Sequence, residues 1–322
     1  MQKELVFSGS PFEIGSQHGE ALRDEIRAVF DIYLDIWGIP KERISQRVEG
    51  FKDAIAKYFP NFVEEIKGIA AGAAFNEDFV YAINARTELL TNHYMECTAI
   101  GVKSQAQQEG HVVLGQNWDW LNDLRGLTRI VQINPLEKPR MKIMIEPGMI
   151  GKIGMNEAGV GVCTNFLNTP KVLREGVPVR VLLRGILECD SYNKASSLVH
   201  SLPRAASANY LICDINNNVG SLESTPLSVR TVSYNIVTHT NVFSARGQYC
   251  QRQERFEKAL RARMTNEKLS LNSIVDSLKD VEAEPLSIRG IETVHTVIMD
   301  LTAQQMMVSD GARCNRFTSY KF

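Results

Sequence analysis

The sequence contains little that would mark a membrane, secreted or nucleic-acid-binding protein. No apolar run reaches the roughly 18 residues that a membrane-spanning helix needs, and the first residues lack the apolar segment of a signal peptide. The 36 Lys and Arg residues are balanced by 37 Asp and Glu residues, so the formal net charge of -1 provides no basic surface for nucleic acid or anionic lipid. We therefore expect a cytoplasmic protein that binds neither nucleic acid nor membrane.

Cysteine is also scarce, with 6 in 322 residues. The six lie far apart, so they form neither a CxxC zinc motif nor a disulfide framework. We expect most of them to be small buried hydrophobic residues in a reducing compartment. Nothing in this pattern predicts a metal or another cofactor. The cysteines are Cys97, Cys163, Cys189, Cys213, Cys250 and Cys314.

The chain does contain enough apolar residues for a sizeable core, because 44% of it is hydrophobic and 23% is charged. Helical spacing dominates the first 90 residues. A long helix is predicted from Pro11, with Ser10 as its N-cap. Another is predicted after Pro60, where Asn61 and Glu64 form a capping-box-like pair.

Small and charged residues give two further indications. Gly68 and Gly72, with the alanines around them, predict close contact between this later helix and a neighbour. Basic residues from Arg252 to Arg263 alternate with Glu and Ala at helical spacing. That pattern is typical of a solvated helix face, not of a nucleic-acid-binding patch.

Strand patterns begin at Cys97. The stretches 97–102 and 111–117 predict one hairpin, and 151–156 and 160–165 predict another. Further strands and helices alternate in two blocks, which favours a layered α+β fold. No linker or repeat appears, so we expect a single domain over residues 1–322.

Cys97 is the first candidate for chemistry, although a mid-chain Cys at the start of a strand is usually a packing residue. A free thiol has a pKa near roughly 8.5 and needs a base to attack at neutral pH. Cleavage of the bond between Glu96 and Cys97 would create one, because the new α-amino group has a pKa near roughly 8. His239 is an alternative base.

Four polar residues would suit such a nucleophile. Asp119 can hold the α-ammonium and Arg289 can favour the thiolate. Asn165 and Asn241, at strand ends, can donate to a developing oxyanion. Each also has an ordinary interpretation: a turn residue for Asp119 and the two Asn residues, and a surface residue for Arg289.

The order of these motifs resembles the acyl-coenzyme A:6-aminopenicillanic acid acyltransferase family (isopenicillin N acyltransferases, peptidase family C45) of the N-terminal-nucleophile hydrolases. The similarity runs nearly end to end. It is carried by Pro11-Phe12-Glu13-Ile14-Gly15, Asn84-Ala85-Arg86-Thr87-Glu88, Cys97-Thr98, Gly115-Gln116-Asn117-Trp118-Asp119, Gly151-Lys152-Ile153-Gly154, Ala205-Ala206-Ser207-Ala208, His239-Thr240-Asn241 and Val297-Ile298-Met299-Asp300.

The resemblance implies a four-layer αββα sandwich with a mostly helical N-terminal pro-segment. It implies a precursor that cuts itself into residues 1–96 and 97–322, which stay associated. Cys97 would be the nucleophile and its α-amine the base.

The resemblance also assigns supporting roles: Asp119 would orient the amine, Asn241 and Asn165 would donate to the oxyanion, and Arg289 would complete the site. One departure matters, because the family pattern has Gly before the nucleophile and this chain has Glu96. Glu is less able than Gly to adopt a strained peptide, which predicts slow or absent self-cleavage.

The function expected from this resemblance is that of a self-processing amidohydrolase or acyltransferase. The substrate would be a small N-acyl compound, and acyl-coenzyme A is a candidate acyl donor; no cofactor is otherwise expected. Two alternatives remain open at this point: an uncleaved Cys–His hydrolase that uses His239, and a catalytically idle binding protein on the same fold.

Overall fold

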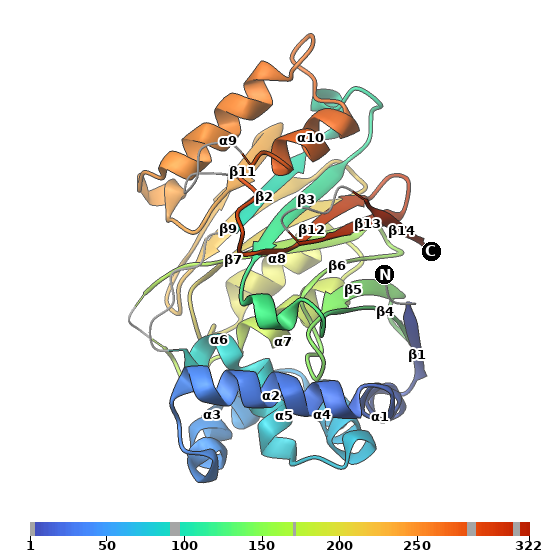
Figure 1. The fold of residues 1–322 in the computed structure, drawn as a ribbon, viewed down its shortest axis with the longest axis vertical. Helices are drawn as coiled ribbons and strands as arrows, with labels where there is room; N and C mark the ends of the chain where they lie inside the picture. The colour runs from blue at the N-terminus through green and yellow to red at the C-terminus, as the bar shows by residue number, and fades with distance from the viewer. Residues whose placement is uncertain (1–3, 91–96, 170–171, 282–287, 312–315) are drawn as a thin grey trace.

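The computed structural model describes residues 4–90, 97–169, 172–281, 288–311 and 316–322 (Figure 1). Glu96 and Cys314 lie outside the described residues. After the first strand, the N-terminal part of the chain is helical, as predicted. Its elements are β1 (Leu5–Gly9), α1 (Pro11–Ala21), α2 (Arg23–Trp37), a 3-10 turn (Lys41–Arg43), α3 (Ile44–Tyr58), α4 (Pro60–Ala73), α5 (Glu77–Asn84) and α6 (Arg86–Leu89).

The start of the first helix was predicted correctly. Ser10 caps α1 and forms a reciprocal capping box with Glu13, and Pro11 occupies the first turn. The single long helix was wrong, because the chain breaks at Leu22 before α2 begins. The predicted capping-box pair of α4 was also wrong: that helix is preceded by Phe59 and has no side-chain cap.

Helices α1 and α4 pack in backbone contact, which confirms the prediction from Gly68 and Gly72. A Cβ atom on Gly68 would lie 2.2 Å from the Phe12 carbonyl oxygen, and one on Gly72 would lie 2.2 Å from the Ser16 carbonyl oxygen. Only glycine permits this approach. The close pairing holds the N-terminal helices together beside the sheets.

The strands form two sheets. The first has the order β1-β4-β5-β6-β7-β8-β9-β10 and is antiparallel except for the β1–β4 pair. Its strands after β1 are β4 (Arg129–Pro135), β5 (Met141–Ile145), β6 (Ile153–Asn156), β7 (Val160–Phe166), β8 (Ala208–Asp214), β9 (Val219–Ser224) and β10 (Val229–Val232).

The second sheet has the order β11-β2-β3-β12-β13-β14. It consists of β2 (Thr98–Val102), β3 (Val113–Asp119), β11 (Ile236–His239), β12 (Thr293–Asp300), β13 (Gln305–Asp310) and β14 (Thr318–Lys321). Both predicted hairpins are present, as β2–β3 and β6–β7.

The two sheets pack face to face, with β2 and β3 against β7 and β8. A Cβ on Gly101 of one sheet would lie 3.0 Å from the Cys213 sulfur of the other. Helices cover the outer faces: α7 (Val179–Leu187) and α8 (Tyr192–Ser201) cover the first sheet, and α9 (Gln251–Ala262) and α10 (Leu271–Leu278) cover the second. The predicted αββα sandwich is confirmed.

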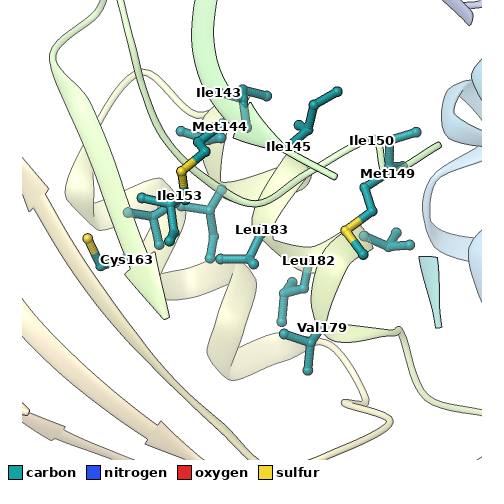
Figure 2. Packing of buried hydrophobic residues seen from close by; sticks show 14 of the residues in the cluster. Ile143, Met144, Ile145, Met149, Ile150, Ile153, Cys163, Val179, Leu182 and Leu183 are labelled. Carbon is teal, nitrogen blue, oxygen red and sulfur yellow. The ribbon is translucent and has the colours of Figure 1, made fainter. Parts of the chain in front are cut away.

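Helix α7 is fixed by apolar packing against the first sheet. Figure 2 shows Leu183 of α7 pointing toward Ile153 of the sheet, with Leu182 and Val179 further along the helix, and all four side chains are buried. This packing sets the rotation of α7 and therefore the direction of its two buried arginines. Among the described residues, no helix has both the length and the apolar character to cross a membrane.

Candidate active site

Cys97 lies immediately before β2, where three strands meet. The β2–β3 register pairs Thr98 with Asn117, and the β2–β11 register pairs Ala99 with His239. Continuing both registers brings Cys97 beside the last residues of β3 and beside Asn241, just beyond β11. Sheet pairing thus gathers residues that are up to 144 positions apart in the chain.

Hydrogen bonds hold Cys97 in this position. Its backbone nitrogen donates to Asn241 Oδ1 at 2.5 Å, and its thiol donates to the Asp119 carbonyl oxygen at 3.7 Å. The side chain is buried, with 6% of its surface exposed. The ordinary interpretation of Cys97 as an apolar strand residue does not account for these polar partners.

The two predicted oxyanion donors both contact Cys97, in different ways. Asn165 Nδ2 donates to the Cys97 carbonyl oxygen at 3.1 Å and to the His239 carbonyl oxygen at 3.4 Å. Asn241 Nδ2 donates to the Phe166 carbonyl oxygen at 2.7 Å. An amide nitrogen has two hydrogens. Asn165 therefore directs both hydrogens at backbone oxygens, whereas within the described residues Asn241 Nδ2 has one acceptor, which leaves its second hydrogen available to a ligand.

Asp119, the last residue of β3, forms a buried ion pair next to Cys97. Arg252 Nη2 lies 2.8 Å from Asp119 Oδ2, and the Thr293 hydroxyl donates to Asp119 Oδ1 at 2.6 Å. Arg252 comes from α9 and is 5% exposed, so the expectation of a solvated helix face was wrong for this residue. Arg252 also donates to the Ile288 carbonyl oxygen at 2.9 Å.

Arg289, which the sequence suggested as the cation beside Cys97, binds Ser309 and Gly311. It is 1% exposed, which rules out the surface interpretation. Its guanidinium donates to the Ser309 hydroxyl at 3.0 Å and to the Gly311 carbonyl oxygen. The cation paired with Asp119 is Arg252.

Burial sets the protonation of the site. It raises the pKa of the Cys97 thiol to about 11, and the nearby Asp119 carboxylate adds to this, despite Arg252 and Lys152. Burial also raises the pKa of Asp119 to about 6, although Arg252 and Thr293 oppose the rise. Cys97 is therefore a neutral thiol at pH 7 and needs a base to react.

His239 does not supply that base in this arrangement. Its Nε2 lies 3.2 Å from Glu223 Oε1, and burial lowers its pKa despite that carboxylate. No histidine occurs among the described residues that line the cavity at Cys97. The Cys–His alternative thus lacks the contact that it requires.

A buried cluster of basic side chains around Glu146, which sequence reasoning did not find, lines the same cavity; burial lowers the pKa of Lys152 within it well below the usual range. Glu146 Oε1 accepts from Arg86 at 3.1 Å and from Lys152 at 2.8 Å. Glu146 Oε2 accepts from the Tyr33 hydroxyl, which in turn accepts from Trp120 Nε1 at 2.8 Å. Burial disfavours the Glu146 carboxylate, but Arg86 and Lys152 outweigh it and lower its pKa to about 2.

Arg180 adds a third cation with few partners. It is 7% exposed, and its Nη2 donates a long hydrogen bond of 3.5 Å to the Thr87 hydroxyl. Its Nε and Nη1 atoms are buried and have no hydrogen-bond partner in the part of the chain that the structure describes. Burial and the neighbouring Arg86 lower its pKa to about 10, so the guanidinium stays charged at pH 7.

The cavity connects this cluster to the thiol. It has a volume of about 30 Å³, and its lining includes Cys97, Asn241, Arg86, Lys152 and Arg180. A larger cleft of about 610 Å³ shares Thr87, Leu90 and Phe166 with it and reaches the surface at Asn168, Val172 and Arg174. The molecule thus presents a cleft that adjoins a narrower, partly open pocket at Cys97, which is lined by basic side chains. No group of three or more His, Cys, Asp or Glu side chains within the described residues is arranged to hold a metal ion.

The two face-to-face sheets between helical layers define the class: this is a fold of the N-terminal-nucleophile hydrolase type. Solved structures share it at low sequence identity. The N-acylethanolamine-hydrolyzing acid amidase ortholog of Caenorhabditis elegans superposes with a TM-score of 0.52 at 16% identity, covering 70% of this chain and 99% of that one. A variant of conjugated bile acid hydrolase from Clostridium perfringens superposes with a TM-score of 0.51 at 16% sequence identity, and the match covers 70% of this chain and 92% of that one. Penicillin V acylase from Agrobacterium tumefaciens superposes with a TM-score of 0.50 at 12% sequence identity, and the match covers 70% of this chain and 86% of that one.

A sequence model of the acyl-coenzyme A:6-aminopenicillanic acid acyl-transferase family matches residues 106–313, and the chain belongs to this family. The match begins after Cys97 and includes Asp119, Arg180 and Arg252. A fungal relative, the 40 kDa form of acyl-coenzyme A:6-aminopenicillanic-acid-acyltransferase from Emericella nidulans, is 29% identical over 234 residues, 70% of this chain and 64% of the relative. Protein dcd1A from Dictyostelium discoideum is 23% identical over 71% of this chain and 58% of its own length. The matched regions thus span less than two thirds of these two relatives.

Proposed function

We propose that this protein is a self-processing amidohydrolase or acyltransferase in which Cys97 becomes an N-terminal nucleophile. One observation carries the proposal: the Cys97 thiol is neutral and none of the described residues brings a side-chain base into contact with it, while its own backbone nitrogen is held by Asn241. A nitrogen held in this way is placed to serve as the base once it becomes a free amine.

Self-cleavage uses the same sulfur. The thiol attacks the carbonyl carbon of Glu96, the C–N bond to Cys97 breaks, and the nitrogen takes the thiol proton to form a thioester and a free amine. Water then adds to the thioester carbonyl, the C–S bond breaks, and the sulfur recovers a proton. The products are a carboxylate on residue 96 and an α-amine on Cys97.

Turnover repeats this chemistry on an N-acyl substrate. The α-amine removes the thiol proton, the sulfur attacks the amide carbonyl, and the second Nδ2 hydrogen of Asn241 stabilises the oxyanion. The C–N bond then breaks, and the α-ammonium gives its proton to the leaving amine. Water releases the acyl group as an acid, whereas a second amine or a thiol, such as that of coenzyme A, accepts it in acyl transfer.

Asn165 and Asp119 act as positioning residues in this mechanism. Asn165 ties the Cys97 carbonyl oxygen to the end of β7, which fixes the backbone that carries the nucleophile. Asp119 places negative charge beside the α-ammonium, and Arg252 holds that carboxylate in its rotamer. These two roles are supported by the contacts of Asn165 with the Cys97 carbonyl oxygen and of Arg252 with Asp119.

The pH dependence of turnover follows from these groups. Below a pH of roughly 8 the α-amine gains a proton, so kcat/KM falls about tenfold per pH unit. Below about pH 6 Asp119 is also protonated, and the fall becomes steeper. Thr293→Val removes a hydrogen bond that lowers the pKa of Asp119, and we expect the steepening to begin at higher pH. A profile governed instead by a single group near pH 6.5, and abolished by His239→Gln, would support the Cys–His alternative.

The direct test of the activity uses chromogenic N-acyl 4-nitroanilides of increasing acyl length with the purified protein. We expect release of 4-nitroaniline that depends on Cys97. Addition of hydroxylamine should divert part of the product to a hydroxamate, because both acceptors react with one thioester. If the protein turns over none of these substrates and Cys97 stays unmodified, the alternative of a catalytically idle binding protein is favoured.

A further inference from the structure

Glu223 and His239 form a buried pair that the mechanism proposed above does not use. Glu223 lies on β9 of the first sheet and His239 ends β11 of the second, and both side chains are 1% exposed. Glu223 Oε1 lies 3.2 Å from His239 Nε2, so the contact joins the two sheets. A buried carboxylate is unfavourable unless hydrogen bonds compensate it, and the other partners of Glu223 show what this pair supports.

Glu223 binds the chain on both sides of Asn241. Its Oε1 also accepts from the Ser244 hydroxyl at 2.7 Å and from the Ala245 backbone nitrogen at 2.9 Å. His239 comes shortly before Asn241 in the chain, and Ser244 and Ala245 follow it. Burial raises the pKa of Glu223, but the hydrogen bonds from His239, Ala245 and Ser244 outweigh it and lower the pKa below its usual value. One ionised carboxylate thus fixes both ends of the turn that carries Asn241.

His239 takes part in this arrangement as a hydrogen-bond donor. A carboxylate can only accept, so the ring hydrogen lies on Nε2, and Nδ1 has no hydrogen-bond partner within the described residues. The backbone carbonyl oxygen of His239 accepts from Asn165 Nδ2 at 3.4 Å. His239 is therefore held through its side chain by one sheet and through its backbone by the residue that also binds Cys97.

The position of the Asn241 backbone matters for the reaction. Asn241 Oδ1 accepts from the Cys97 nitrogen, and Asn241 Nδ2 donates to the Phe166 carbonyl oxygen at 2.7 Å. Both bonds involve the amide group and leave the backbone to be fixed elsewhere. The first bond also changes when the Cys97 nitrogen becomes a free amine. Because misplacing a catalytic group by about 1 Å can cost about 10²-fold in rate, the turn needs a support that self-cleavage does not alter.

We propose that Glu223 is a positioning residue for the oxyanion donor Asn241, and that His239 is its second anchor and not a base. Glu223 acts through the backbone of the turn and does not touch the substrate. This role rests on the thioester chemistry proposed above. It also gives a function to the histidine of the His239-Thr240-Asn241 motif.

The test compares Glu223→Leu with Glu223→Gln on an N-acyl 4-nitroanilide. Leucine has a similar size but no acceptor, and we expect kcat to fall about 10- to 100-fold while KM stays within about threefold, because the donor acts on the transition state. Glutamine keeps an acceptor oxygen and should stay within about threefold of the parent. His239→Gln keeps a donor for Glu223 and should retain turnover with the pH profile of the parent, which a base at His239 would not allow.

A double-variant cycle shows whether Glu223 acts through Asn241. Asn241→Ala removes the donor itself and should lower kcat about 10²- to 10³-fold. Adding Glu223→Leu to Asn241→Ala should then cause a further loss of less than about threefold, because a donor that is absent cannot be misplaced. Losses that multiply in the double variant would overturn the positioning role.

Asp214 provides the matched control. It is 2% exposed, lies at the other end of β8 from Ala208, and accepts from the backbone nitrogens of Tyr192 at 2.9 Å and Asn218 at 3.1 Å. Asp214→Leu thus removes a buried carboxylate that also holds turns, and it should keep kcat close to that of the parent. An equal loss of kcat in Asp214→Leu would mean that general loosening of the fold, and not the position of Asn241, explains the effect.

Amide hydrogen exchange adds a readout that does not depend on activity. A peptide covering residues 239–247 should exchange faster in Glu223→Leu than in the parent. If Glu223→Leu does not fold, Ser244→Ala removes only one of the hydrogen bonds and should lower kcat roughly two- to tenfold. Unchanged exchange, or unchanged kcat in these variants, would overturn the role of Glu223 and leave the amidase function standing. If the parent turns over no N-acyl substrate, the proposed function fails and the positioning role fails with it.

Discussion

Replacing Cys97 with alanine is expected to abolish turnover of N-acyl substrates, with a loss of at least about 10³-fold in kcat/KM. The variant removes the atom that forms the thioester, so no other residue of the site compensates. It also keeps the shape of the site, because Asn241 and Asn165 bind the backbone of Cys97 and not its side chain. The fold should therefore survive, and hydrolysis measured on a 4-nitroanilide isolates the loss of chemistry.

A second buried cysteine provides the matched control. Cys163 on β7 is fully buried, and burial keeps its thiol protonated with a pKa well above the usual range. Cys163→Ala removes a sulfur of the same kind from the same core and should retain turnover close to that of the parent. Cys97→Ser tests the nucleophile more finely, since a hydroxyl is a weaker nucleophile than a thiol. Equal turnover by Cys97→Ser and the parent would contradict the assignment.

Arg252→Met is expected to reduce the free energy of unfolding by about 3–5 kcal/mol. The substitution leaves Asp119 buried without its cationic partner, and desolvated charge is then uncompensated. The loss should also lower turnover, because Arg252 counteracts the rise in the pKa of Asp119. Urea denaturation monitored by tryptophan fluorescence gives the stability change directly.

Arg261→Met is the control on the same helix. Arg261 has a side chain that is 63% exposed and contacts Glu257 at 3.6 Å. Exposed pairs contribute about 0–1 kcal/mol, so this variant should unfold at nearly the parent's urea concentration. Similar losses for both substitutions would mean that the Arg252–Asp119 pair has no special role in holding the site.

The part of the site built by local strand pairing could be predicted from the sequence. The turn and strand spacing between Cys97 and Asp119 already implies a hairpin, and its register brings the two residues together. Asn165 and Asn241 could be found as amides at strand ends. Their separate roles could not, because hydrogen-bond direction depends on which carbonyl groups the other sheet presents.

The cationic residues were beyond sequence reasoning for a physical reason. Arg252 lies 133 positions from Asp119 on a helix whose charge pattern is that of a solvated face. Arg252 lies four and eight residues before Phe256 and Leu260 and shares their buried face, but charged residues surround these positions, so the pattern assigned Arg252 to solvent and left Arg289 as the cation at the site. Arg180 was equally hidden: Arg180 and Arg184 lie on one face of an amphipathic helix, a pattern typical of a solvated face, yet every residue of α7 is buried. Helix-to-sheet packing, and not local propensity, places these groups.

The intact mass of the freshly purified protein under denaturing conditions tests the central claim most directly, beside that of Cys97→Ala. The parent is expected to yield two fragments that separate between Glu96 and Cys97, in a fraction that grows with time because Glu96 slows the cleavage, while Cys97→Ala stays at 36.1 kDa. Glu96→Gly should cleave at least as fast as the parent, because glycine relaxes the backbone before the nucleophile. A single 36.1 kDa species in the parent, together with full amidase activity, would contradict the N-terminal-nucleophile mechanism.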